Sequence, residues 1–142
     1  MIPKILEELR EKVGPERVLT SDFLAHRYTH VWRMDIPLQA KAVLLPTSTE
    51  DVSTIMRICH KHKQTVVVHG GLTNLVGGTE STREDIVIST EKMTSIEEID
   101  ETSRSITVQA GVILENIHQA VSEKGLMFPL TFGAKGSAQV GG

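Results

Sequence analysis

Four glycines lie within nine residues, from Gly70 to Gly78, directly after the β-branched run 65–68. Glycine allows positive φ angles and lets a ligand approach the backbone without meeting a Cβ atom. Successive backbone N–H groups in such turns can converge on one anion, and Thr73 and Asn74 can add hydroxyl and amide donors. The segment therefore predicts a loop for a pyrophosphate, which offers many acceptors to neutral donors. A wide turn that needs glycine only for positive φ fits the same spacing.

Two familiar phosphate-binding motifs do not match this loop. The Walker motif ends in Gly-Lys-Ser/Thr, whereas Gly78 is followed by Thr79-Glu80. The Rossmann motif opens a helix with three glycines, whereas the polar segment 80–83 and then another strand follow here. A dinucleotide bound by this loop therefore requires a different fold.

The other reactive side chains predict no second site. His60 and His62 are two residues apart on a predicted helix, so they do not share a face and indicate a solvated helix end. His69 borders the loop and could contact a phosphate. The remaining candidates lack a recognisable setting for a nucleophile or a metal ligand: His26, His30, Ser53, Cys59, Ser81, His118 and Ser137. We therefore expect neither a metal site nor a catalytic residue in these residues.

The composition and net charge of the chain limit the kinds of molecule it is expected to bind. The chain has 142 residues, of which 39% are hydrophobic and 23% charged, with a net charge of −3, as expected of a globular domain. No basic tract points to nucleic acid or an anionic membrane, so an anion site must be local. Cys59 is the only cysteine, and no run resembles a signal peptide or approaches the roughly 20 apolar residues of a membrane span. We expect a reducing, cytoplasmic setting.

The elements that must position the loop follow from periodicity and caps. Helices are predicted at about 3–13, 21–26, 49–61 (capped by Ser48) and 113–124, the last ended by Gly125. Strands are predicted at 42–45, 65–68 and 85–89, and a hairpin at 95–110 turns at 101–104. Strand 42–45, the next helix and strand 65–68 form a β-α-β unit with parallel strands and a right-handed crossover. The fold class is α+β, a mixed sheet flanked by helices.

The tail 126–142 holds four further glycines and no strong periodicity after Leu130. It ends in Val140-Gly141-Gly142, with no later element to dock against. We expect that the chain stops inside a domain of a longer protein.

Two separated motifs carry a resemblance to a known family. The first is the strand followed by Gly-Gly-x-Thr and Gly77-Gly78; the second is Gly-Ala-Lys-Gly-Ser at 133–137 with Val140-Gly141-Gly142. In this order, from about Ala40 to Gly142, the chain resembles the PCMH or vanillyl-alcohol oxidase type of FAD-binding domain. The second motif is similar to the branch that contains D-2-hydroxyglutarate dehydrogenase, D-lactate dehydrogenase and the related component of glycolate oxidase. The resemblance implies a helical arm at 1–40 and a truncated FAD-binding domain at 41–142.

The resemblance also implies the site. Backbone amides of the first loop would hold the FAD pyrophosphate, and the second segment would line the ribityl and isoalloxazine side. Carried over, these positions are His69, Gly70, Gly71, Leu72, Thr73, Asn74, Leu75, Pro129, Thr131, Gly133, Gly136, Ser137, Gly141 and Gly142. No histidine lies in the stretch that matches covalent attachment points, so non-covalent FAD is implied.

The implied activity is that of an oxidoreductase. The intact enzyme would oxidise a D-2-hydroxy acid to the 2-oxo acid, with hydride transfer to the flavin. The catalytic base, substrate-binding arginine and any metal ligands would follow Gly142, so these residues alone are expected to be inactive. The alternatives are a non-catalytic nucleotide- or anion-binding module and another flavin reductase on the same fold.

The chain departs from the family pattern in the first loop. His69 stands where Gln or Arg is usual, and Gly71-Leu72-Thr73-Asn74 stands where Gly-Asn-Thr-Gly is usual. Asn74 tolerates positive φ better than most residues, so we expect it to replace glycine there. Leu72 loses a polar side chain but keeps its N–H group.

Overall fold

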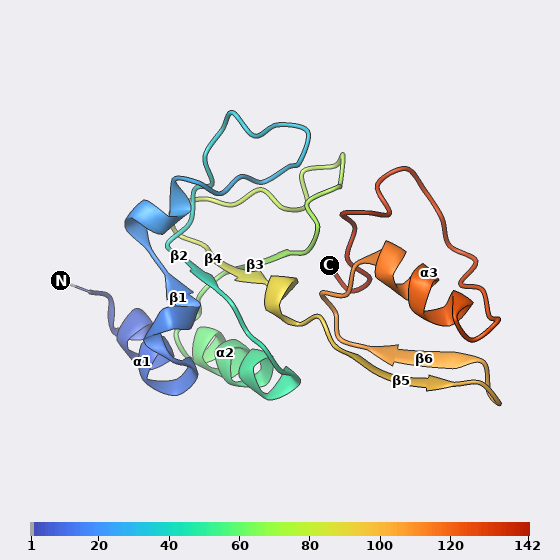
Figure 1. The fold of residues 1–142 in the computed structure, drawn as a ribbon. Coiled ribbons are helices and arrows are strands. Elements are labelled where there is room, and N and C mark those ends of the chain that lie inside the picture. Colours follow the sequence, from blue (N-terminus) through green and yellow to red (C-terminus); the bar gives the residue numbers. More distant parts are fainter. Residues whose placement is uncertain (1) are drawn as a thin grey trace.

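The computed structural model describes residues 2–142. Its first part is a four-stranded mixed sheet in the order β1-β2-β4-β3, seen on the left of Figure 1. The strands are β1 (Val18–Leu19), β2 (Ala42–Leu44), β3 (Val66–His69) and β4 (Ile86–Ser89). β1 is antiparallel to β2, and β2 and β3 both run parallel to β4. The α+β class and the mixed sheet are confirmed.

The predicted β-α-β unit is β2, helix α2 (Thr49–Lys61) and β3. Its two strands are parallel, but β4 lies between them. All four residues of β4 are buried, whereas β3 has only His69 buried. A parallel strand that is apolar on both faces takes the central place, because both of its faces are covered there.

Successive residues of the strands face opposite layers. Ala42 and Leu44 pack against the apolar faces of α2 and of helix α1 (Lys4–Val13). Val43 and Val87 pack instead against Leu24 and Leu38 of the N-terminal arm. The arm therefore closes the face of the sheet that the helices leave open. The predicted short helix in this arm is a single 3-10 turn, Ser21–Leu24.

The caps that the sequence predicted for α2 and the last helix are present. Ser48 Oγ accepts a hydrogen bond from Asp51 N at 3.1 Å, which satisfies one free amide of the first turn of α2. Gly125, just after α3 (Leu114–Ser122), has a φ of +69°. These local signals were sufficient to predict both helices.

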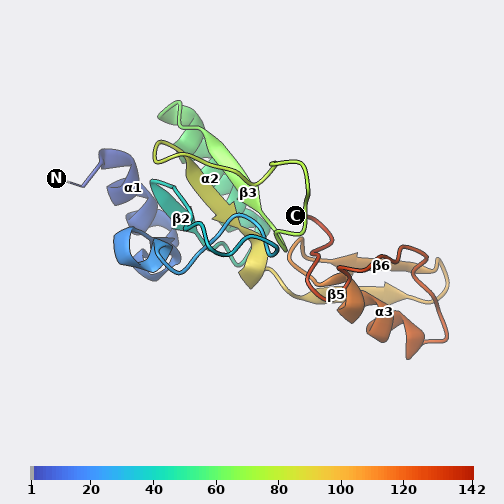
Figure 2. The same ribbon diagram turned by 90° about the horizontal axis from the view of Figure 1, so that it is seen from above.

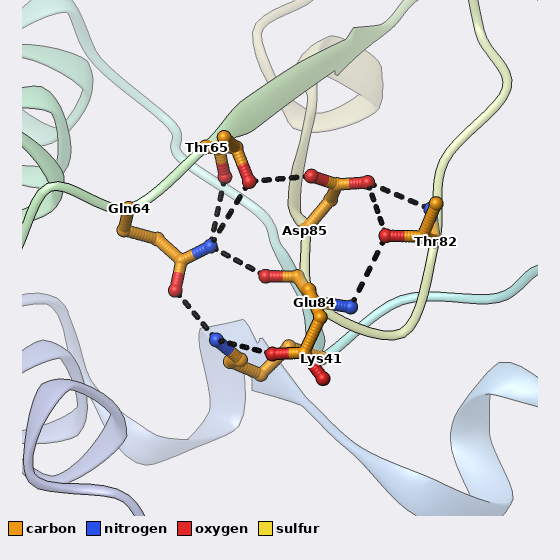
Figure 3. Close-up of polar contacts among 6 residues, drawn as sticks. All are labelled: Lys41, Gln64, Thr65, Thr82, Glu84 and Asp85. Atoms are coloured by element: carbon orange, nitrogen blue, oxygen red, sulfur yellow. Dashed lines mark hydrogen bonds and ion pairs between the residues drawn. The ribbon is translucent and has the colours of Figure 1, made fainter.

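A polar network ties together the amino-terminal ends of β2, β3 and β4 (Figure 3). Asp85 accepts hydrogen bonds from the Thr65 hydroxyl and from the amide and hydroxyl of Thr82. Gln64 Nε2 donates to Glu84 O at 2.6 Å, and Lys41 Nζ donates to Gln64 Oε1 at 2.7 Å. The glycine loop leaves β3 from the opposite, carboxyl-terminal edge of the sheet.

The second part is the hairpin of β5 (Ile96–Asp100) and β6 (Ser105–Val108), packed against α3 (Figures 1 and 2). Its small core joins Val112, Ile117 and Val121 with hydrophobic residues of β6 and of segment 126–128. The hairpin turns at Arg104, which has a φ of +56°. Within residues 2–142, no helix combines the length and apolar character that a membrane crossing requires.

Candidate functional site

The two glycine segments meet where the sheet and the second part join. A Cβ atom built on Gly70 would lie 2.5 Å from the Cα atom of Gly142, and one on Gly71 would overlap the carbonyl of Ser137. Side chains at these positions would force the segments apart. Gly70 and Gly71 are therefore needed for close approach, whereas Gly77, with a φ of +74°, serves the turn as predicted.

The loop carries a run of free hydrogen-bond donors. Within residues 2–142, the backbone N–H groups from Gly70 to Leu75 donate to no protein acceptor. Two of the loop's carbonyls, by contrast, are engaged: Leu72 O accepts from Val31 N and Asn74 O accepts from Trp32 Nε1, both at 3.0 Å. Backbone donors without a protein partner need water or a ligand. Consecutive free amides of this kind suit an anion with many acceptor oxygens.

The left-handed residue of the loop differs from the prediction. Leu72 has a φ of +58°, and Asn74 does not take a positive φ, so that expectation for Asn74 is wrong. Asn74 instead braces the loop from inside. Its Oδ1 accepts from Val76 N and Gly78 N at 3.2 Å, and its Nδ2 donates to Thr79 Oγ1 at 2.8 Å. One of the two N–H groups of its amide side chain is therefore committed to Thr79.

His69 closes the base of the loop. Its ring is buried, and Nε2 lies 2.7 Å from Thr79 O. Burial lowers the pKa of His69 because the charged imidazolium loses hydration. The neutral ring therefore donates Nε2–H to the carbonyl of Thr79. This arrangement makes His69 a link between the two limbs of the loop.

The second glycine segment is held by backbone hydrogen bonds to the start of α3 and to residues 110–112, which precede it. The carbonyls of Ala138 and Lys135 accept the N–H groups of Leu114 and Glu115, at 2.9 and 3.0 Å. They thus cap the first turn of α3, which has no side-chain cap. This use of the amides removes the N-terminus of α3 as a candidate anion site.

Thr90 joins the two segments. Its hydroxyl lies 2.5 Å from Gln139 Oε1 and 3.3 Å from the carbonyl oxygen of His69. Gly111 allows this packing, because a Cβ atom there would overlap the Thr90 carbonyl. One buried side chain thus connects the end of β3 to the second glycine segment.

Between the segments lies a groove of about 350 Å³. Its lining includes the predicted residues Gly70, Gly71, Leu72, Thr73, Asn74 and Gly142. The predicted site residues leave out six further lining residues, Val68, Gly78, Thr79, Phe132, Ala138 and Gln139. The motif spacing could have indicated the last three, since they lie between predicted positions.

The other predicted positions do not line this groove. Leu75 is 81% exposed at the tip of the loop. Pro129 and Thr131 line a separate hollow of about 390 Å³ beside α3. Ser137 and Gly141 pack against Gly71 and Ala110, and a Cβ atom on Gly133 would meet nothing within 4 Å. Gly136 faces the carboxylate of Glu115.

Three other reactive side chains, His62, Cys59 and His118, make contacts within the fold away from the groove. His62 lies 2.8 Å from Glu8 at the protein surface, and burial raises the pKa of the Cys59 thiol, which keeps it protonated. His118 lies at the edge of the small core and contacts the Leu130 carbonyl at 2.7 Å. No group of three or more potential metal ligands occurs among the residues that the structure describes.

The fold and the groove define a dinucleotide-binding domain in which a glycine loop from a mixed sheet faces a second glycine segment. The chain belongs to the family described as the FAD binding domain, whose model matches residues 40–142. FAD is thus its cofactor.

Named relatives agree with this assignment. A Schizosaccharomyces pombe protein with the provisional name mitochondrial D-lactate dehydrogenase is 46% identical over 104 residues, which are 73% of this chain and 20% of that protein. The mitochondrial D-2-hydroxyglutarate dehydrogenase of Bos taurus is 35% identical over 132 residues, 93% of this chain and 24% of that protein. The chain thus spans about a quarter or less of these two relatives.

The fold is shared with a solved alkyldihydroxyacetonephosphate synthase. The TM-score is 0.84 at 18% identity, over 99% of this chain and 28% of the synthase. This likeness concerns the fold alone. Together with the family match over residues 40–142, it confirms the predicted type of FAD-binding fold.

Proposed function

We propose that the free amides from Gly70 to Leu75 bind the pyrophosphate of FAD. The observation that carries this proposal is the run of unpaired N–H groups beside a groove shared with the second glycine segment. The close backbone packing at Gly70 and Gly71 holds that run in place. Neutral amide donors fit a ligand with many acceptors and need no cluster of cationic side chains.

The second segment supplies the opposite wall. In this proposal Pro129, Thr131, Gly133, Gly136, Ser137, Gly141 and Gly142 follow the cofactor away from its phosphates, and His69 supports the loop through Thr79. The arm is residues 1–40 and the FAD-binding domain begins at 41. No histidine lies in the stretch that matches covalent attachment points, so in this proposal FAD is bound non-covalently and denaturation is expected to release it.

The intact protein is proposed to oxidise a D-2-hydroxy acid of the 2-hydroxyglutarate, lactate or glycolate type. The names of the relatives support this substrate class. When bound, FAD supplies the acceptor for the hydride from C2 of the substrate. The residues described here bind and orient the cofactor, and we propose that proton transfer and substrate binding use residues outside this chain.

Purification of the full-length protein tests the proposal. Flavin absorption bands that are retained, or restored after adding FAD, are expected, together with turnover of D-2-hydroxyglutarate, D-lactate or glycolate. Binding of ADP without any flavin would favour the non-catalytic nucleotide-binding module. Flavin binding without turnover of any of these acids would favour another reductase on the same fold.

A further inference from the structure

The segment 29–33 of the N-terminal arm lies against the glycine loop and does not line the groove. Val31 N donates to Leu72 O at 3.0 Å, and Trp32 Nε1 donates to Asn74 O at 3.0 Å. A third bond runs from the Thr79 hydroxyl to Thr29 O, at 2.6 Å. The arm and the loop run side by side in Figure 1, and neither Val31 nor Trp32 lines the groove.

These bonds determine which way the loop's amides point. In a trans peptide the carbonyl of one residue and the N–H of the next point in opposite directions. Because the arm holds the carbonyl of Leu72, the N–H of Thr73 is directed away from the arm. Because Trp32 holds the carbonyl of Asn74, the N–H of Leu75 is likewise directed away from Trp32. The arm thus orients two of the free donors.

Trp32 is itself held in position. Its ring stacks on His30, with centroids 4.7 Å apart and planes 25° apart. The His30 ring is 3% exposed, and its Nδ1 has no hydrogen-bond partner within residues 2–142. The other ring nitrogen, Nε2, lies 3.5 Å from Glu80 Oε1, so burial and stacking fix the ring on which Trp32 rests.

We propose that residues 29–33 form a strap that holds the glycine loop in its anion-binding conformation, with Trp32 as a positioning residue. This inference rests on the proposed function of the loop. It places a determinant of cofactor affinity outside residues 40–142, which the family model matches. Trp32 acts through the Asn74 carbonyl and does not touch the cofactor.

The test is Trp32→Phe in the full-length protein, which removes the N–H donor and keeps an aromatic ring over His30. FAD titration of the apoprotein, followed by quenching of flavin fluorescence, should show a dissociation constant raised by about three- to tenfold, the effect of losing one hydrogen bond. The unfolding midpoint should fall only slightly, as expected for the loss of one exposed hydrogen bond. Met34→Leu, an exposed position on the same arm, is the matched control and should bind as the wild type does.

Amide hydrogen exchange in the wild type covers the case in which Trp32→Phe does not fold. Adding FAD should slow exchange at Thr73 and Leu75 and, through the strap, at Val31. Equal FAD affinity in Trp32→Phe and in the wild type would contradict the strap proposal. Slower exchange at the Thr73 and Leu75 amides with no change at the Val31 amide would also contradict it. A wild-type protein that binds no FAD counts instead against the proposed function.

Discussion

Gly71 and Ser137 pack so closely that a methyl group on Gly71 would overlap the carbonyl oxygen of Ser137. This contact joins two glycine segments that are far apart in sequence and sets the spacing of the groove walls. The glycine is required by a neighbouring backbone, because the φ of Gly71 is not positive.

Gly71→Ala should therefore separate the two segments. We expect a loss of about 1–3 kcal/mol in the free energy of unfolding, the usual cost of overpacking, and a large loss of FAD affinity. Denaturant unfolding and FAD titration measure the two effects. Gly78→Ala is the matched control for stability, because a Cβ atom at Gly78 meets nothing within 4 Å. Met34→Leu, exposed and outside the groove lining, is the control for FAD affinity. A stable, tightly binding Gly71→Ala protein would contradict the packing.

Leu72→Asn should stabilise the loop. Leu72 has a φ of +58°, a conformation that costs most L-residues about 1–2 kcal/mol and that Asn tolerates better. We expect a gain of up to about 1 kcal/mol in unfolding free energy, measured by denaturant titration. Leu75→Asn, at an exposed position without positive φ, should change little. A marked loss of stability in Leu72→Asn would show that the Leu72 side chain matters more than its backbone conformation.

His69 should make stability depend on pH. Its folded pKa is lowered by burial from the ordinary value of 6.5, so below pH 6.5 the unfolded chain takes up a proton that the folded protein resists. The contribution of the neutral ring to the free energy of unfolding is fully present above pH 6.5. It is lost as the pH falls toward the lowered pKa of the folded protein. His69→Gln, whose amide can donate to Thr79 O, should flatten this part of the profile.

The measurement for His69 is the unfolding midpoint between pH 7.5 and 5. His60→Gln, at an exposed helix position, should leave the wild-type slope in place. If the unfolding midpoint of His69→Gln depends on pH as steeply as that of the wild type, His69 is not the cause of the pH dependence.

Asp85→Ala should separate stability from cofactor binding. The Asp85 carboxylate accepts three hydrogen bonds at the amino-terminal edge of the sheet (Figure 3), so its removal should cost about 1–3 kcal/mol of unfolding free energy. FAD affinity should hold under conditions where the variant is folded, because the groove lies at the opposite edge. Glu84→Ala, whose side chain is 86% exposed, should cost less than about 0.5 kcal/mol. Loss of FAD binding by folded Asp85→Ala would show that the two edges are coupled.

Much of the fold could be predicted from local patterns. The start of α2 at Ser48, the hairpin turn at 101–104 and the C-terminal Gly125 depend on residues a few positions apart. The left-handed residue of the glycine loop was predicted wrongly, as Asn74, because intrinsic preference was the only guide. The bond from Val31 to Leu72 O adds a long-range constraint that no local preference contains.

The sequence by itself determined the elements, which follow from periodicity and caps, and the two glycine motifs, whose resemblance to a known type of domain indicated the family. Only the tertiary structure decided that β4 separates β2 from β3, that Gly70 and Gly71 pack against residues 137–142, and that Asn74 and His69 brace the loop. It also decided that Val31 and Trp32 hold the loop's carbonyls. These relationships join residues distant in sequence, and their energies depend on packing and hydrogen bonds that exist only once the chain has folded.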